Sequence, residues 1–164
     1  MGACSFDWEL ASKFIPVITG IIAIGVAIFV YWAWHKQKGK EVVANEAKAY
    51  LIKLAELQNL QSKIYKHEKE NNYYEYDKES FICFKKIKDE ISGSAIFLGE
   101  ALKSDTQFSH DSTTVLSQAI LFIDDFNEYL NGTKELESIR MIDSDDARKL
   151  TDQLRDHSIY KKIF

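Results

Sequence analysis

The pattern of apolar and polar residues begins with a long uncharged stretch. Residues 14–34 contain no Asp, Glu, Lys or Arg. A helix rises about 1.5 Å per residue, so a stretch of this length covers roughly 30 Å, which is the thickness of the hydrocarbon core of a bilayer. The pattern therefore predicts a transmembrane helix over residues 14–34.

A cleaved signal peptide is the main alternative for this stretch. Signal peptides have a basic start, an apolar segment of about 7–15 residues and a cleavage site of small residues. Here the leader, residues 1–13, contains Asp7 and Glu9 and one basic residue, Lys13. The apolar stretch is longer than that and ends in Tyr31-Trp32-Ala33-Trp34, which suits the boundary between lipid and water. The sequence therefore favours a retained anchor.

The basic residues after the span predict its orientation. Lys36, Lys38 and Lys40 follow the apolar stretch, whereas Lys13 alone precedes it. By the positive-inside rule, residues 1–13 form a short extracytoplasmic leader and the C-terminal region lies in the cytoplasm. Residues 35–40 then form a basic juxtamembrane joint in which the three lysines contact anionic lipid. The expected location is the inner (plasma) membrane of the cell.

The last residues of the chain offer a second location. Lys161-Lys162-Ile163-Phe164 resembles the dilysine retrieval signal of eukaryotic endoplasmic-reticulum membrane proteins. In a eukaryote, the endoplasmic reticulum membrane is therefore the alternative. The other interpretation is a charged helix end, because lysine is favourable near the negative end of a helix dipole.

Small residues recur on one face of the predicted span. Gly20, Ala23 and Ala27 are separated by steps of three and four, which allows two helix backbones to approach closely. The pattern predicts helix–helix contact and a homo-oligomer formed through the span. The other interpretation is the ordinary abundance of Gly and Ala in membrane helices.

Apolar residues recur at helical steps beyond the joint. Four stretches show this period, residues 41–70, 78–102, 113–130 and 145–162, with a shorter apolar piece near Leu136. The first stretch is long and close to coiled-coil spacing, although packing within a bundle explains it equally well. We expect an all-α fold: one N-terminal transmembrane helix, then a cytoplasmic helical bundle of about four to five helices in residues 41–164.

Polar stretches and capping residues define where these helices are expected to end. Residues 103–111 are expected to form a loop, with Asp111 and Ser112 capping the third helix. Asn131-Gly132 is expected to end that helix in a left-handed conformation, and Asp143 to cap the last one. Paired asparagines at residues 71–72 suggest a turn after the first helix.

Charge and cysteine content exclude some classes of function. The net charge is −4, and the cytoplasmic part is basic only beside the membrane, which disfavours nucleic-acid binding. Cys4 and Cys83 lie on opposite sides of the predicted membrane and outside any C-x-x-C motif.

A cluster of tyrosines after the first cytoplasmic helix is a possible partner surface. Tyr73, Tyr74 and Tyr76 combine apolar area with polar tips, as residues at protein interfaces often do. The other interpretation is that they cover the end of a helical core.

Groups that carry catalytic chemistry are weakly represented. Asp124, Asp125 and Glu128 lie close together on the third helix, but a bundle carboxylate site also needs Glu-x-x-His pairs, and the sequence has none. We expect these acids to form the solvated face of a central helix. No phosphate loop, nucleophile elbow or dinucleotide motif occurs. The sequence therefore predicts no catalytic activity, no cofactor and no metal.

The combined pattern suggests a single-pass, membrane-anchored interaction or scaffold protein that binds an unknown cytoplasmic protein. In architecture alone the chain resembles small bacterial proteins with one N-terminal span and a helical cytoplasmic domain. The alternative is a membrane-acting effector of the toxin or phage-defence type, whose spans oligomerise and perturb the bilayer. Thr19 carries the only hydroxyl in the span before Tyr31, which counts against a water-filled pore.

Overall fold

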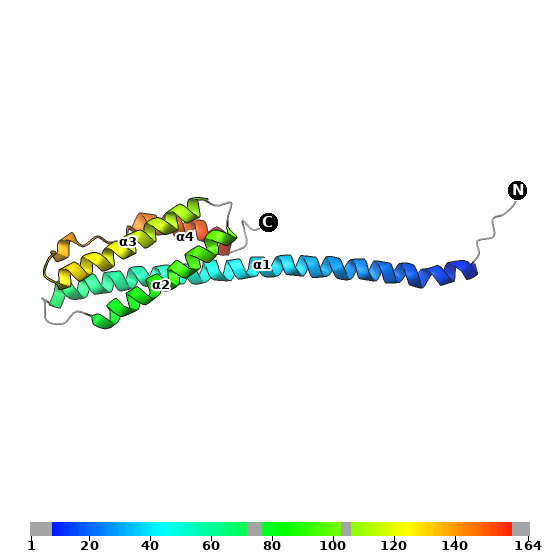
Figure 1. Cartoon of the computed structure of the whole chain (residues 1–164), viewed down its shortest axis with the longest axis horizontal. Helices are drawn as coiled ribbons and strands as arrows, with labels where there is room; N and C mark the ends of the chain where they lie inside the picture. Colours follow the sequence, from blue (N-terminus) through cyan, green and yellow to red (C-terminus); the bar gives the residue numbers. More distant parts are fainter. Residues whose placement is uncertain (1–7, 72–76, 103–105, 159–164) are drawn as a thin grey trace. The chain divides into compact units, whose positions relative to one another are not determined.

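The computed structural model describes residues 8–71, 77–102 and 106–158. These residues form four α-helices and one short 3₁₀-helix and contain no strand (Figure 1). The elements are α1 (Trp8–Asn71), α2 (Lys78–Ala101), α3 (Thr106–Leu130), η1 (Leu136–Ser138) and α4 (Ser144–Ser158). The predicted all-α fold is confirmed for this part of the chain.

The chain divides into two compact units. The first is Met1–Glu41 and contains the apolar part of α1; the second is Val42–Phe164 and contains the rest of α1 with all other helices. Residues 35–40 are helical, including Gly39. A single glycine costs a helix only about 1 kcal/mol relative to alanine, which the flanking helical residues readily offset.

In the second unit, α2 runs antiparallel to α1. The Ser94 hydroxyl donates to Glu46 Oε1 at 2.5 Å, and Lys63 Nζ donates to Ser80 Oγ at 2.8 Å. Residue numbers therefore rise along α1 as those of their partners fall along α2.

Helix α3 packs against α2, η1 and α4. Aromatic rings join it to α2, with centroids 4.9 Å apart for Phe84 and Phe122 and 4.6 Å apart for Phe81 and Phe126. These pairs run in opposite order along the two helices, so α2 and α3 are antiparallel as well. The prediction that the third helix is central agrees with these contacts.

Helix α4 returns along α3. Gln118 Nε2 donates to Asp146 Oδ2 at 2.9 Å, and Gln153 Nε2 donates to Asp111 Oδ2 at 2.6 Å. The second unit is therefore an up-down-up-down helical bundle, in which each helix is antiparallel to the next.

The apolar stripe predicted within residues 41–70 faces the core of this bundle. Most of its members are fully buried there: Ala47, Tyr50, Leu54, Leu57, Gln61 and Ile64. This arrangement corresponds to the bundle-packing alternative. Gln61 is accommodated because its Oε1 accepts a hydrogen bond from the Ile142 backbone N–H at 3.2 Å.

The expected start of the third helix is wrong. The structure places the first residue of α3 at Thr106, within the stretch predicted as a loop, and Asp111 and Ser112 lie inside the helix. Phe108 explains the difference, because its side chain is fully buried and its ring lies 6.2 Å from that of Tyr50. This tertiary contact stabilises a helical turn that the Ser- and Thr-rich sequence would not favour alone.

Two predicted helix ends are confirmed. Gly132 has a φ of +72° and its N–H donates to the Tyr129 carbonyl at 2.9 Å, which ends α3 in the left-handed conformation. At the start of α4, Asp143 Oδ1 accepts from the Asp145 N–H at 2.7 Å, as expected of a helix N-cap.

Asp77 caps α2 and gives a first prediction. Its carboxylate accepts from the Ser80 N–H at 2.9 Å and from the Ser80 hydroxyl at 2.6 Å. Replacing Asp77 with Ala removes the cap and is expected to lower the free energy of unfolding by about 1 kcal/mol. Asp77→Asn keeps an acceptor and should lose much less. Urea unfolding of the full chain in detergent, followed by circular dichroism, measures both; equal losses would contradict the assignment.

Candidate functional site: the apolar span and the buried polar network

Within the described residues, α1 contains the one stretch long and apolar enough to cross a membrane. No part of its most apolar window is buried. Ile28 and Phe29 are 64% and 66% exposed, as expected of side chains on a helix that no other element covers. The Thr19 hydroxyl donates to the Ile15 carbonyl at 2.8 Å, so the span's polar side chain is satisfied within its own helix.

Aromatic and basic side chains pair at the C-terminal end of the apolar stretch. The rings of Tyr31 and His35 are stacked with centroids 6.0 Å apart, and Lys36 Nζ lies 5.4 Å from the centre of the Trp32 ring. The second distance is within the range of a cation–π interaction. Such pairs present apolar rings and positive charge together, the combination found at the boundary between lipid and water.

The three predicted lysines lie on exposed helix in this region. Lys38 Nζ pairs with Glu41 Oε2 at 3.2 Å, across one helical turn, whereas Lys36 points over Trp32. Both contacts are local, and exposed pairs of this kind contribute at most about 1 kcal/mol. Lys36 and Lys38 are exposed, whereas Lys40 is half-buried.

The predicted small-residue face of the span forms a shallow hollow. Its walls are Ala23, Val26, Ala27, Val30, Tyr31 and Trp34. Gly20 lies one turn away, and a Cβ atom built there would meet nothing within 4 Å. The face is thus open along the helix. Tyr73, Tyr74 and Tyr76, the predicted partner surface, lie outside the described residues.

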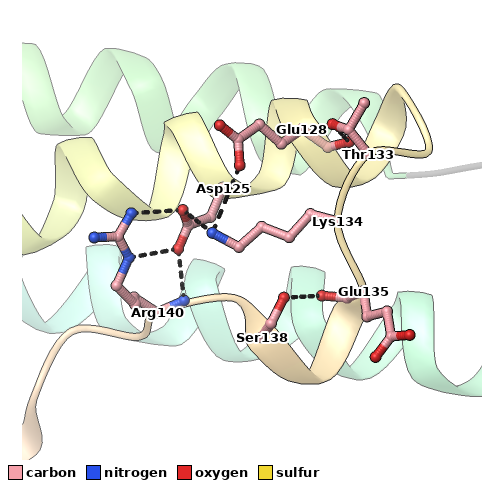
Figure 2. A network of polar contacts seen from close by, with 7 residues as sticks. All are labelled: Asp125, Glu128, Thr133, Lys134, Glu135, Ser138 and Arg140. Carbon is pink, nitrogen blue, oxygen red and sulfur yellow. Dashed lines mark hydrogen bonds and ion pairs between the residues drawn. The ribbon is translucent and has the colours of Figure 1, made fainter.

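A polar network surrounds Asp125 on α3 of the bundle (Figure 2). Asp125 is only 1% exposed. The Arg140 guanidinium binds the Asp125 carboxylate through two hydrogen bonds, from Nε to Oδ2 at 2.8 Å and from Nη2 to Oδ1 at 2.7 Å. The Arg140 backbone N–H also donates to Oδ2 at 2.9 Å, and Lys134 Nζ donates to Oδ1. Figure 2 shows both cations reaching α3 from the segment that follows it.

The expectation that Asp124, Asp125 and Glu128 form a solvated face is wrong for Asp125. Asp124 and Glu128 are exposed, whereas Asp125 shares the buried stripe of α3 with Phe122, Phe126 and Tyr129. Burial of the carboxylate is tolerated because two cations and one backbone N–H bind it. The spacing of Asp125 in the sequence indicates this burial, because residues 122, 125, 126 and 129 share one helical face.

This network stabilises the fold and is not suited to bind a ligand. Both oxygens of Asp125 already accept two hydrogen bonds each, which leaves the carboxylate little capacity to bind a ligand or to take a proton from one. Instead, it fixes the segment from Lys134 to Arg140 against α3. Among the described residues, no cluster of three or more His, Cys, Asp and Glu side chains forms a metal site.

The carboxylates of Asp125 and Asp77 predict how stability depends on pH. Hydrogen bonds from Arg140 hold the pKa of Asp125 far below its usual range, and hydrogen bonds from Ser80 lower the pKa of Asp77 to about 2. An unfolded Asp has a pKa of about 3.9, so the folded state binds fewer protons than the unfolded state at acidic pH. The stabilisation is complete at about pH 5, well above the unfolded pKa, and is lost progressively as the pH falls toward the folded values.

We therefore expect the urea midpoint of the bundle to fall between about pH 5 and pH 2. In Asp125→Asn this fall should be shallower, because a carboxylate with a strongly lowered pKa is gone. Asp124→Asn should retain the wild-type slope. A wild-type slope in Asp125→Asn would contradict the proposed role of Asp125.

A second buried acid lies near the C-terminal end of the long helix. Glu68 is buried, its Oε2 accepts from the Tyr129 hydroxyl at 3.2 Å, and its Oε1 lies 3.7 Å from His67 Nδ1. The hydrogen bond from Tyr129 joins α1 to the last turn of α3.

Comparison of the chain with protein-family models, curated proteins and solved structures finds no match.

Proposed function

We propose that the chain is a single-pass, membrane-anchored helical protein whose bundle serves as an interaction or scaffold module. The observation that carries this proposal is the uncharged, uncovered apolar stretch at residues 14–34. A core helix of a water-soluble protein would be buried by its neighbours, whereas every side chain of residues 14–34 except that of Ala33 is exposed. Exposed apolar surface of this extent is costly in water and favourable in lipid.

The proposed topology has residues 1–13 outside the cell membrane and the bundle in the cytoplasm. Lys36, Lys38 and Lys40 support it, together with the ring pairs of Tyr31 and Trp32 beside them. The bundle lies beyond these lysines along the chain and would recruit a cytoplasmic protein, with Tyr73, Tyr74 and Tyr76 as the proposed contact. The hydroxyl of Thr19, satisfied within the helix, provides no polar lining for a channel, which favours an anchor over a pore-forming effector.

Two single-cysteine variants test the location and the topology. One keeps Cys4 and carries Cys83→Ala; the other carries Cys4→Ser, Cys83→Ala and Ile82→Cys, since Ile82 is exposed. We expect the chain to resist extraction of membranes by alkaline carbonate. A membrane-impermeant maleimide should label Cys4 in intact cells and position 82 only after permeabilisation. Release by carbonate would refute the anchor, and the reverse labelling would refute the orientation.

Self-association of the span is proposed as part of this function. Replacing Gly20 and Ala23 with Ile should weaken the oligomers that cross-linking detects in membranes, because the larger side chains keep two helix backbones apart. Gly25→Ile is the matched control, since Gly25 lies on the opposite face and a Cβ there also meets nothing within 4 Å. Cross-linking that both variants leave unchanged would remove the self-association claim.

A further inference from the structure

Three exposed apolar side chains lie at one end of the bundle. Val42 is 48% exposed, Ile96 72% and Phe97 43%. Val42 is the first residue of the bundle unit, and Ile96 and Phe97 belong to the last two turns of α2. We call these three residues the rim.

The contacts between α1 and α2 bring the members of the rim to the same level. Glu46 meets Ser94, and about two turns further along α1, Lys53 Nζ pairs with Glu90 Oε2 at 3.2 Å. Following this antiparallel order backwards from Glu46 places the turn that contains Val42 beside the last residues of α2. The rim is therefore the end of the bundle at which the chain enters from the span.

A short tether joins this end to the span. Val42 follows Trp34 by eight residues, which is about 12 Å along a helix and less than about 30 Å in any conformation of the chain. The headgroup layer adds roughly 5–7 Å to each side of the hydrocarbon core. Along a helix, Val42 therefore lies only about 5–7 Å beyond the headgroup layer, so if the span crosses the bilayer, tilting of the bundle toward the lipid is enough to bring the rim among the headgroups.

We propose that the rim is a second contact of the chain with the bilayer, in which Val42, Ile96 and Phe97 insert between lipid headgroups. This inference rests on the proposed membrane anchor and extends it to the bundle. A lipid surface is the occupant that the tether favours, because attachment to the span makes the encounter intramolecular and raises its effective concentration. Aromatic and aliphatic side chains bury their apolar surface at that boundary.

The same helix supplies a matched control position. Ile82 is 56% exposed and lies near the opposite end of α2, about 20 Å from Ile96 at the rise of an α-helix. A fluorophore at position 82 therefore samples an exposed apolar site on the same helix that the tether does not hold near lipid.

Quenching by lipid in reconstituted full-length protein tests the proposal. Single cysteines at positions 26, 82 and 97 (Val26→Cys, Ile82→Cys, Phe97→Cys) are introduced with Cys4→Ser and Cys83→Ala and labelled with bimane. Vesicles of phosphatidylcholine and phosphatidylglycerol contain a phosphatidylcholine with a nitroxide near its headgroup or in its acyl chain. We expect the acyl-chain nitroxide to quench the label at 26, the headgroup nitroxide to quench that at 97, and neither to change that at 82.

Labels at positions 26 and 97 report separately on the membrane anchor and on the contact of the rim with lipid. Quenching at 26 without quenching at 97 overturns the rim contact and leaves the anchor in place. No quenching at either position overturns both. If the emission at 97 changes with the density of protein in the vesicle and not with the nitroxide, the rim contacts a second copy of the chain, and the lipid contact is refuted.

Discussion

Lysines at positions 21 and 24 are expected to remove the chain from the membrane. Ile21 and Ile24 lie in the central part of the apolar stretch and are exposed. A lysine at the centre of a membrane helix costs about 3 kcal/mol, so Ile21→Lys with Ile24→Lys opposes insertion by about 6 kcal/mol. This corresponds to roughly a ten-thousand-fold shift in the partition of the chain between membrane and water.

The matched control for this variant lies on the bundle. Ile52 and Ile82 are as exposed as the two span positions but belong to the second unit. Ile52→Lys with Ile82→Lys adds the same charge and should leave the protein in the membrane fraction. Separation of membrane and soluble fractions after alkaline carbonate, with immunodetection of the chain, measures both variants. Retention of the span variant in the membrane would mean that something other than residues 14–34 holds it there.

Asp125→Asn is expected to have the largest effect on the stability of the bundle. The substitution removes the charge that binds Arg140 and Lys134 and replaces one acceptor oxygen by an amide that cannot accept from either. Asp125 is buried, whereas the Arg140 side chain is 56% exposed, so we expect the loss of these charge-assisted hydrogen bonds to cost about 2–3 kcal/mol, a large part of the stability of a domain of this size. The segment from Lys134 to Arg140 should then separate from α3.

Asp124→Asn provides the comparison at the neighbouring position. Asp124 is exposed, so the loss of its charge should change the free energy of unfolding by no more than about 0.5 kcal/mol. Urea unfolding of both full-length variants in the same detergent gives the difference directly. Amide hydrogen exchange should show faster exchange at the Arg140 N–H in Asp125→Asn alone. Equal stability of the two variants would show that the network does not hold the bundle together.

Features that depend on neighbouring residues were predictable from the sequence. The length and lack of charge of residues 14–34 are local properties, as is the helical period of Leu54, Leu57 and Ile64. Helix ends with their own capping residues, such as Asn131-Gly132 and Asp143, were also correctly placed. In these cases the hydrogen bonds that define the structure lie within a few residues of one another.

The start of α3 required tertiary contacts. Residues 106–112 include Thr, Ser, His and Asp, which favour caps and turns, so local propensity predicted a loop. The buried ring of Phe108 against Tyr50 outweighs that propensity. Its partner lies 58 positions earlier in the chain, and no local pattern reveals it.

Apart from the start of α3, the helical segments follow from short-range periodicity, and the stretch apolar enough for a membrane follows from composition, so both can be predicted from the chain alone. The burial of Asp125, and not of Asp124, depends on tertiary contacts, since its cations arrive from Lys134 and Arg140 across a turn. The tertiary structure also decided that Ile96 and Phe97 lie at the same end of the bundle as Val42. Both outcomes depend on how helices distant in sequence pack together, and burial and ion pairing are settled at that level.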